Sequence, residues 1–214
     1  MKISVLCSNT NHPVYKRLQN WVDEKTEQHE ISLVHQKAEL VGGDILFLVS
    51  CTDVIPLVNR QKYNSCLVLH ASDLPKGRGW SPAIWELLDG STVVTVSLIE
   101  AVDNVDTGMI WKKLSASIPV DALWNEINDI IFSLELEIME FAIENYTHII
   151  PYEQATDVEP TYFHRRTPEN SELNPSLTIS EQFNLMRICD PVRYPAFFKL
   201  HGQNYRLILE KMND

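Results

Sequence analysis

Short apolar runs separated by polar, turn-prone segments dominate the first half of the chain. Five runs have the length and β-branched content of strands: 3–7, 31–34, 45–49, 67–69 and 93–96. The run at 45–49 has no polar residue, which is typical of a strand covered on both faces of a parallel sheet. After Pro13, apolar residues recur every three or four positions, which predicts a helix. This alternation predicts an α/β fold with a doubly wound, mostly parallel sheet.

A further strand and a long helix are predicted next. The strand is expected at 109–114, and apolar residues then recur at helical spacing over about 120–146. One side of this helix is expected to be a solvated acidic face, marked by Glu126, Glu135, Glu137, Glu140 and Glu144.

The last quarter of the chain predicts a smaller extension. The polar residues 148–175 include four prolines and are interpreted as an ordered surface loop. A capping box at 178–181 predicts a helix, and apolar segments around Gly202 predict a hairpin. We therefore expect a core over 1–150 and a C-terminal helix and β-hairpin extension over 151–214, packed on the core.

The charge balance narrows the classes of partner. The 214 residues carry 18 Lys and Arg against 29 Asp and Glu, a formal net charge of −11. Because nucleic-acid binding requires many basic side chains, this balance argues against a nucleic-acid partner. No apolar run approaches the ~20 residues of a membrane span, and no signal segment is recognised, so no membrane partner is expected. The four cysteines have no metal-binding spacing and are expected to be reduced thiols in a cytoplasmic protein.

A histidine and an aspartate each follow a predicted strand. His70 comes directly after the run at 67–69 and precedes the turn-prone residues 71–79. Asp106 lies in the loop after the run at 93–96. Ligands of open α/β sheets bind beyond the carboxyl ends of the strands, so these loops are the expected place of a functional site.

Polar residues also follow the first strand, and they have two interpretations. Asn9, Asn11 and His12 could bind an anion or ligand at the start of a helix, or they could only cap the helix and shape the turn. Ser81 and Pro82 are placed as the N-cap and first position of another helix. No Gly-x-Gly-x-x-Gly motif follows the first strand, so a dinucleotide fingerprint is absent.

The stretch from Cys66 to Gly108 resembles the catalytic core of the N10-formyltetrahydrofolate-dependent formyltransferases. The residues that match the family pattern, in order, are His70, Ser72, Leu74, Pro75, Arg78, Gly79, Pro82, Gly90, Thr95, Asp106, Thr107 and Gly108. The sequence of residues 70–82, HASDLPKGRGWSP, is most similar to the nucleotide-sugar N-formyltransferases of pseudaminic-acid-type pathways. Weaker similarity covers 8–13 and 165–169. One position departs from the pattern, because Val68 stands where the family has Asn.

The resemblance implies a Rossmann-like fold and a formyltransferase activity. The implied co-substrate is N10-formyltetrahydrofolate, with no metal, and the implied acceptor is the primary amine of a nucleotide-linked amino sugar in glycan biosynthesis. The most specific acceptor is UDP-4-amino-4,6-dideoxy-N-acetyl-altrosamine, a pseudaminic acid precursor. A homodimer is conceivable through the long helix and the hairpin, although nothing in the sequence requires it.

The resemblance also assigns roles to residues. His70 is the implied proton carrier and Asp106 its partner. The implied cofactor-binding residues are Leu48, Ser50, Arg78, Gly79, Val102, Asn104 and Val105. The implied acceptor-binding residues are Ser8, Asn9, His12, Lys76, Trp80, Arg165 and Arg166. For Arg78 and Gly79, shaping a turn remains the alternative, and for Trp80 the alternative is packing.

The missing Asn leaves the donor for the oxyanion open. Because strand side chains alternate, positions 68 and 70 share a face, yet Val68 cannot donate a hydrogen bond. Protonated His70 could serve alone, a group such as Ser50, Asn104 or a main-chain N–H could substitute, or the enzyme could be slow or inactive. We favour a substitute. The alternative functions are a formyltransferase for another small or carrier-bound amine and a catalytically inactive folate-binding homologue.

Overall fold

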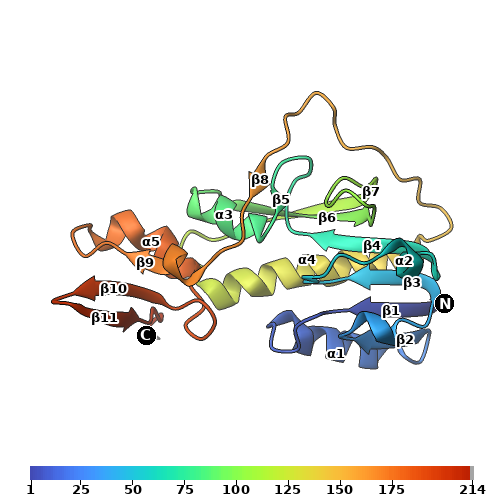
Figure 1. The fold of residues 1–214 in the computed structure, drawn as a ribbon, viewed down its shortest axis with the longest axis horizontal. Helices are drawn as coiled ribbons and strands as arrows, with labels where there is room; N and C mark the ends of the chain where they lie inside the picture. Colours follow the sequence, from blue (N-terminus) through green and yellow to red (C-terminus); the bar gives the residue numbers. More distant parts are fainter. Residues whose placement is uncertain (213–214) are drawn as a thin grey trace.

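A six-stranded sheet forms the centre of the molecule in the computed structural model, which describes residues 1–212 (Figure 1). The strand order is β2-β1-β3-β4-β6-β7. The strands are β1 (Lys2–Leu6), β2 (Glu30–Val34), β3 (Gly43–Leu48), β4 (Tyr63–His70), β6 (Val93–Glu100) and β7 (Ile110–Ser117). The first four in this order are parallel, whereas β6 pairs antiparallel with β4, and β7 with β6. The predicted mostly parallel α/β fold is confirmed.

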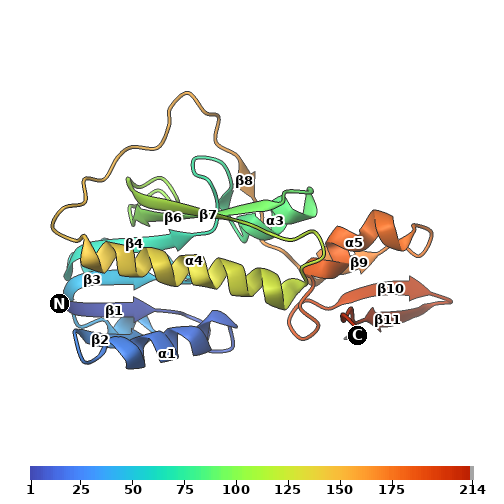
Figure 2. The same cartoon turned by 180° about the vertical axis from the view of Figure 1, so that it is seen from behind.

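Helices cover the two faces of the sheet unequally. They are α1 (Val14–Lys25), α2 (Leu57–Arg60), α3 (Pro82–Leu88), α4 (Trp124–Glu144) and α5 (Ile179–Ile188), with 3₁₀ turns η1 (Lys37–Glu39) and η2 (Pro168–Ser171). The long α4 crosses one face, where it shares the main apolar core with α1 and α3 (Figure 2). A smaller core lies on the opposite face. Since strand side chains alternate, Leu67 and Leu69 belong to the main core, whereas Val68 and His70 face the other side.

The C-terminal residues form a small unit beside the carboxyl ends of β1, β3 and β4 (Figure 1). It contains α5 and a sheet of β9 (Glu172–Leu173), β10 (Ala196–Leu200) and β11 (Gln203–Leu207). The buried guanidinium of Arg187 donates to the carbonyls of Pro119 and Ala122 and thereby joins this unit to the start of α4. The predicted helix and hairpin are both confirmed.

The segment 148–167 connects α4 to the C-terminal unit, and we call it the connecting segment. It arches over the loops that follow β4 and β6 (Figure 1). It contains β8 (Tyr162–Phe163), which pairs with β5 (Arg78–Gly79) in the loop after β4. Residues beyond the predicted core therefore pack directly on the loop that carries the formyltransferase-like motif.

One local expectation is wrong. Glu135 is only 5% exposed, because it lies between Phe132 and Ile138 on the wide buried face of α4. Burial raises the pKa of its carboxyl group to about 8. Ser81 is the N-cap of α3 and Pro82 is its first residue, as expected, although the backbone of Ser81 is left-handed (φ 49°) and its side chain makes no capping hydrogen bond. None of the helices in residues 1–212 combines the length and apolar content that crossing a bilayer requires.

Candidate active site

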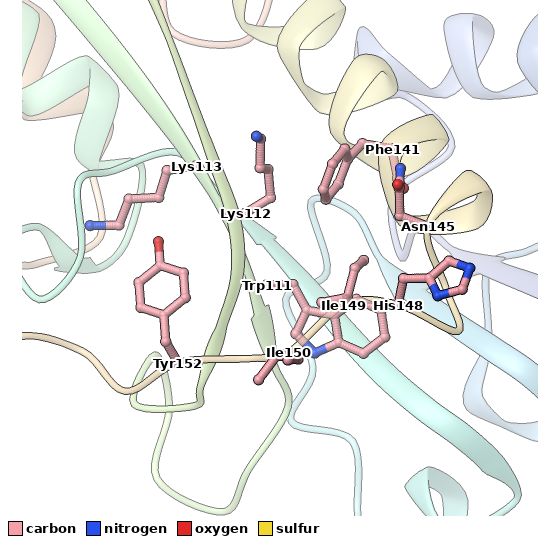
Figure 3. Close-up of a pocket in the computed structure, with 9 residues that line it drawn as sticks. All are labelled: Trp111, Lys112, Lys113, Phe141, Asn145, His148, Ile149, Ile150 and Tyr152. Atoms are coloured by element: carbon pink, nitrogen blue, oxygen red, sulfur yellow. The ribbon is translucent and has the colours of Figure 1, made fainter.

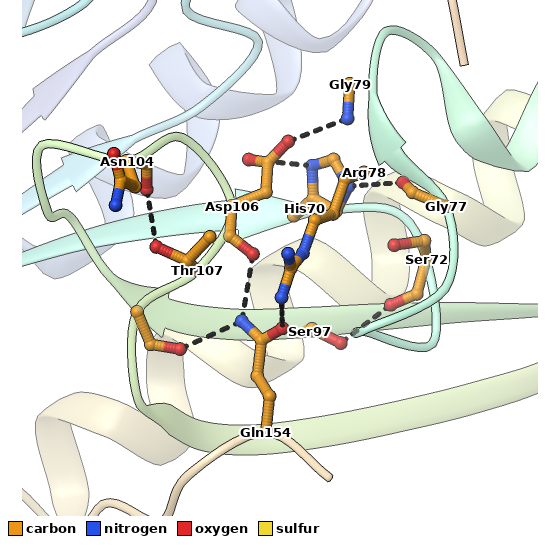
Figure 4. A network of polar contacts seen from close by, with 11 residues as sticks. His70, Ser72, Gly77, Arg78, Gly79, Ser97, Asn104, Asp106, Thr107 and Gln154 are labelled. Atoms are coloured by element: carbon orange, nitrogen blue, oxygen red, sulfur yellow. Dashed lines mark hydrogen bonds and ion pairs between the residues drawn. The ribbon is translucent and has the colours of Figure 1, made fainter. Parts of the chain in front are cut away.

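His70 is the last residue of β4, and both of its ring nitrogens have partners (Figure 4). Nε2 lies 2.8 Å from the main-chain carbonyl oxygen of Gly77. Nδ1 lies 3.5 Å from Oδ1 of Asp106. The fold therefore brings together the two residues that the resemblance implies as proton carrier and partner.

The antiparallel direction of β6 explains how Asp106 comes to lie beside His70. Because β6 runs antiparallel to β4, the loop at 101–109 leaves β6 near the middle of β4, where the N–H of Ala101 donates to Cys66. The loop then folds back, and Asp106 takes a left-handed backbone with φ 59°. Its Oδ2 accepts a hydrogen bond of 2.8 Å from the N–H of Gly79. The loop also requires glycine at 108, where a Cβ would overlap the carbonyl of Glu100.

These contacts define how the pair can handle a proton. A carbonyl oxygen can only accept, so Nε2 of His70 carries the hydrogen that it donates to Gly77. Exchange of a proton is therefore left to Nδ1, the nitrogen that faces Asp106. The two side chains are 8% and 6% exposed, so the pair is largely buried.

The loop after His70 is held by several neighbours. The hydroxyl of Ser97 donates to the carbonyl of Ser72, and the ammonium of Lys113 reaches both Asp73 and the carbonyl of Leu74. Further along, the N–H of Gly77 donates to the Thr161 hydroxyl of the connecting segment. This packing fixes the carbonyl of Gly77, on which His70 depends.

The resemblance implies that Arg78 and Gly79 contact the cofactor. In the structure, both residues contact other protein groups. The guanidinium of Arg78 donates to Oε1 of Gln154 (2.8 Å) and to the hydroxyl of Tyr162 (3.1 Å). Gly79 has φ 97°, and a Cβ there would overlap the carbonyl of Phe163. The turn-shaping alternative therefore fits Arg78 and Gly79.

The other residues expected at the cofactor lie in two neighbouring places. Leu48 is buried at the end of β3 in register with Val68, and the carbonyl of Ser50 accepts from the Ser8 hydroxyl at 3.5 Å. Val102, Asn104 and Val105 form the exposed rim of the loop that carries Asp106. Their role toward a cofactor stays a prediction.

The residues expected to bind the acceptor lie in several separate parts of the structure. His12 is half-buried, and its Nδ1 accepts a hydrogen bond from the N–H of Val14 at the start of α1. Burial, followed by the nearby Arg193, lowers its pKa to about 4, so His12 is neutral. Asn9 is exposed and closes a turn by accepting from the N–H of Asn11. For both, the capping alternative fits the geometry.

Four more expected acceptor residues surround the loop after β4. The guanidinium of Arg165 lies over the exposed ring of Trp80, 4.9 Å from its centre. Lys76 is exposed, and its charge acts on Glu86 of α3. Arg166 is buried, where it donates to the hydroxyl of Ser171 inside the C-terminal unit. The structure thus pairs Trp80 with Arg165, whereas Lys76 and Arg166 interact with other residues.

The structure adds a residue that the sequence did not single out. Nε2 of Gln154, in the connecting segment, donates to the carbonyls of Asp106 (2.9 Å) and Gly108 (3.0 Å). No sequence signal distinguishes Gln154, because it lies in a polar loop outside any motif.

Two cavities flank this region. One of about 450 Å³ lies between the edge strand β7 and α4 and is lined by Trp111, Lys112 and Phe141 among others (Figure 3). The other, of about 410 Å³, is lined by Thr107 and Gly108, by Arg78, and by residues of the connecting segment that include Gln154. Neither cavity is lined by His70 or Asp106. Within residues 1–212, no group of three or more His, Cys, Asp or Glu side chains is arranged to hold a metal ion.

Sequence comparison finds formyltransferases. No protein-family model matches the chain. The methionyl-tRNA formyltransferase of Rickettsia bellii is 28% identical over 136 residues, which make up 63% of this chain and 44% of that protein. The chain therefore spans less than half the length of the curated relatives that it matches.

Solved formyltransferases are similar over the whole chain. The methionyl-tRNA formyltransferase from Clostridium thermocellum has a TM-score of 0.83 at 22% identity, covering 100% of this chain and 94% of that one. HypX from Aquifex aeolicus in complex with tetrahydrofolic acid has a TM-score of 0.81 at 22% identity, covering 98% of this chain and 37% of that one. A sugar N-formyltransferase from Shewanella sp FDAARGOS_354 has a TM-score of 0.73 at 13% identity, covering 100% and 99%. These likenesses confirm the resemblance in the sequence: the chain has the Rossmann-like fold of the formyltransferase family.

Proposed function

We propose that the chain is a formyltransferase that moves a formyl group from N10-formyltetrahydrofolate to the primary amine of a nucleotide-linked amino sugar. The observation that carries the proposal is the 3.5 Å pairing of His70 with Asp106, which are remote in sequence and are both part of the family motif. The formyltransferase relatives and the neighbour HypX, a complex with tetrahydrofolic acid, support the reaction class and the donor.

The reaction needs a group that moves a proton at the reacting centre. The acceptor nitrogen attacks the formyl carbon and forms a new C–N bond, while the carbonyl electron pair moves to oxygen. Return of this pair breaks the bond to N10. The acceptor nitrogen loses one proton and N10 gains one, so no net proton is released. We assign this transfer to Nδ1 of His70, because Nε2 is bound to Gly77, and Asp106 stabilises the imidazolium that forms.

The loop that carries Asp106 is suited to a folate. Val102 and Val105 are 42% and 59% exposed, and they lie on the loop that carries the buried Asp106. Arg60 of α2 donates to the carbonyl of Ala101 (2.6 Å) and so fixes the base of this loop. A flat, partly apolar pterin ring fits such a surface, with the main-chain groups of the loop as its polar partners.

The choice of acceptor rests on charge and on one exposed pair. A net charge of −11 disfavours a large polyanion such as tRNA. Arg165 over Trp80 presents a cation and an aromatic surface together, and Arg is suited to bidentate contact with a diphosphate. The finer assignment to UDP-4-amino-4,6-dideoxy-N-acetyl-altrosamine rests on the sequence resemblance. We also propose a cytoplasmic location, because Cys7, Cys51, Cys66 and Cys189 are free thiols.

The similarity to methionyl-tRNA formyltransferases favours a second acceptor, an amine carried on tRNA. Val68 favours a third outcome, a folate-binding protein without turnover. The test is a transfer assay with N10-formyltetrahydrofolate and three kinds of acceptor: UDP-linked amino sugars, dTDP-linked amino sugars and methionyl-tRNA. N-formyl product is detected by mass spectrometry, and folate binding is measured separately by calorimetry.

We expect an N-formylated nucleotide sugar and no formyl-methionyl-tRNA. Transfer to methionyl-tRNA alone would replace the sugar acceptor. Folate binding without transfer to any amine would overturn the enzymatic proposal.

A further inference from the structure

Gln154 uses its whole side-chain amide to connect three segments. Its Nε2 donates to the carbonyl oxygens of Asp106 and Gly108, at 2.9 and 3.0 Å. Its Oε1 accepts from Nη2 of Arg78 at 2.8 Å. Figure 4 shows the amide between the loop of Asp106 and the guanidinium of Arg78. The amide thus ties the connecting segment to the loop after β4 and to the loop after β6.

The orientation of the amide is fixed by its partners. A guanidinium can only donate and a carbonyl can only accept, so the oxygen must face Arg78 and the nitrogen must face Asp106 and Gly108. A carboxylate of the same size would keep the first contact. It would lose the other two, because it has no hydrogen to offer to a carbonyl.

Asp106 has a particular need for such support. Its left-handed φ of 59° is uncommon for a non-glycine residue, and the residues just before it are exposed. Its side chain is held by Gly79 and His70, whereas its own carbonyl is held by Gln154. A strained backbone conformation at a functional position persists only where several surrounding contacts hold it in place.

Arg78 is held in turn by groups of the connecting segment. Nη1 donates to the hydroxyl of Tyr162 at 3.1 Å, and the guanidinium lies 5.8 Å from the centre of the Tyr162 ring. The main-chain N–H of Arg78 donates to the carbonyl of Thr161 at 2.9 Å. The connecting segment thereby anchors both ends of the contact between Arg78 and Gln154.

We infer that Gln154 is a positioning residue, which fixes the carboxylate of Asp106 at Nδ1 of His70 by holding the main chain on both sides of Thr107. This inference rests on the proposed formyl transfer for its catalytic consequence. It assigns to the connecting segment, which lies outside the formyltransferase-like motif, a direct part in building the site.

The test compares two substitutions at 154 with a control on the same segment. Gln154→Ala removes all three hydrogen bonds. Gln154→Glu keeps the contact with Arg78 and removes the two bonds to the loop. Glu159→Gln changes an exposed side chain of the connecting segment for which the structure shows no hydrogen bond. Hydrogen exchange of the peptide spanning 101–109 is measured for each protein, together with kcat and KM for donor and acceptor.

Both Gln154 variants are expected to exchange the amides of 106–109 faster and to lose about 10- to 100-fold in kcat, since a misplacement of about 1 Å can cost this much. KM for the acceptor is expected to change by less than about threefold, because Trp80 and Arg165 lie outside the loop. KM for the folate donor is expected to rise, because the loosened loop is the one proposed to bind it. Glu159→Gln is expected to behave as the unchanged protein in every measurement. If Gln154→Glu and Glu159→Gln have the same melting temperature, a difference between them in kcat or in exchange is not caused by a general loss of stability.

The outcomes separate the two proposals. If the unchanged protein transfers formyl groups and Gln154→Glu retains its kcat and its protection at 106–109, the positioning role is overturned while the proposed function stands. If the unchanged protein transfers nothing but both Gln154 variants lose protection at 106–109, the proposed function fails and the structural part of the inference stands. Should Gln154→Ala not fold, the isosteric Gln154→Glu decides alone.

Discussion

Two loops that follow strands of the main sheet each contain a histidine. His70 pairs with a carboxylate, whereas His12 does not. We call the first the His12 corner, which follows β1 and includes Cys7, His12 and Glu135. The second is the His70 corner, which follows β4 and includes His70 and Asp106. In the sequence the two look alike, since each is a histidine among small polar residues after an apolar run.

Their surroundings differ in charge. In the His12 corner, burial lowers the pKa of His12 to about 4 and raises the pKa of Glu135 to about 8, so both are neutral near pH 7. The ring of His12 packs on Phe132, with the ring centres 5.8 Å apart. In the His70 corner, the imidazole faces a carboxylate at 3.5 Å. A histidine becomes a candidate proton carrier through the segment that folds back onto it and not through its position at a strand end.

The largest expected effect is the one that separates the two histidines. His70→Ala should lower kcat by roughly 10²–10⁴, the usual cost of removing a positioned acid–base group. His12→Asn should change kcat only a few-fold, because its main contact is a cap on the N–H of Val14. The measurement is steady-state transfer of the formyl group to the amino sugar, with circular dichroism as a control for folding. Equal losses in the two variants would contradict the contrast between the corners.

A second change would turn the His70 corner into a copy of the His12 corner. Asp106→Asn keeps an oxygen for the N–H of Gly79 but places an amide N–H against Nδ1 of His70. Nδ1 would then accept a hydrogen bond, as Nδ1 of His12 does from Val14. Because the neutral ring is then favoured, we expect kcat to fall by about 10²-fold, within the range for loss of acid–base function.

This prediction has its own check on stability. The melting temperature of Asp106→Asn should stay close to that of the unchanged protein, since the substitution is isosteric and keeps the contact with Gly79. A rate equal to that of the unchanged protein would show that the charge of Asp106 is not needed.

The contrast also shows what the sequence can and cannot predict here. The strands, the main helices and the pairing of His70 with Asp106 follow from periodicity and from an ordered motif. The antiparallel direction of β6 does not, because a strand of this length has no local signal for its direction. Gln154 and the burial of Glu135 depend on which side of a loop or helix meets a distant segment. Local sequence patterns do not specify such long-range packing.

The His12 corner should reveal itself in the pH dependence of stability. The folded pKa of Glu135, about 8, lies above the ordinary value of 4.5, so the folded state holds a proton that the unfolded state has lost between these pH values. This contribution to stability is complete below pH 4.5 and is lost as the pH rises through 8. Glu135→Gln does not titrate. Relative to the unchanged protein it should gain on the order of 3 kcal/mol between pH 5 and pH 8.

The comparison is made by urea unfolding of both proteins at the two pH values. Other groups, including His12, titrate in both proteins and cancel in the difference. A constant difference in unfolding free energy across this range would show that Glu135 is ionised in the folded protein and that the His12 corner is not kept neutral.

The smallest expected effect concerns the one position where the His70 corner departs from the formyltransferase pattern. Val68 shares a sheet face with His70 and packs against Leu74, Ile99 and Ile110. Val68→Asn would bring an N–H donor to this face, and the partly buried amide should cost about 1 kcal/mol of stability. Transfer should remain detectable, at a rate equal to or above that of the unchanged protein.

Val68→Leu is the matched control, because Leu has about the size of Asn and no hydrogen-bond donor. If Asn accelerates transfer and Leu does not, the unchanged protein lacks an oxyanion donor at this position, and the added amide supplies it. Equal rates in all three proteins would mean that a group elsewhere already donates to the oxyanion. Complete loss of transfer in a folded Val68→Asn protein would place the reacting carbonyl away from this face of β4. The His70 corner would then be no more catalytic than the His12 corner.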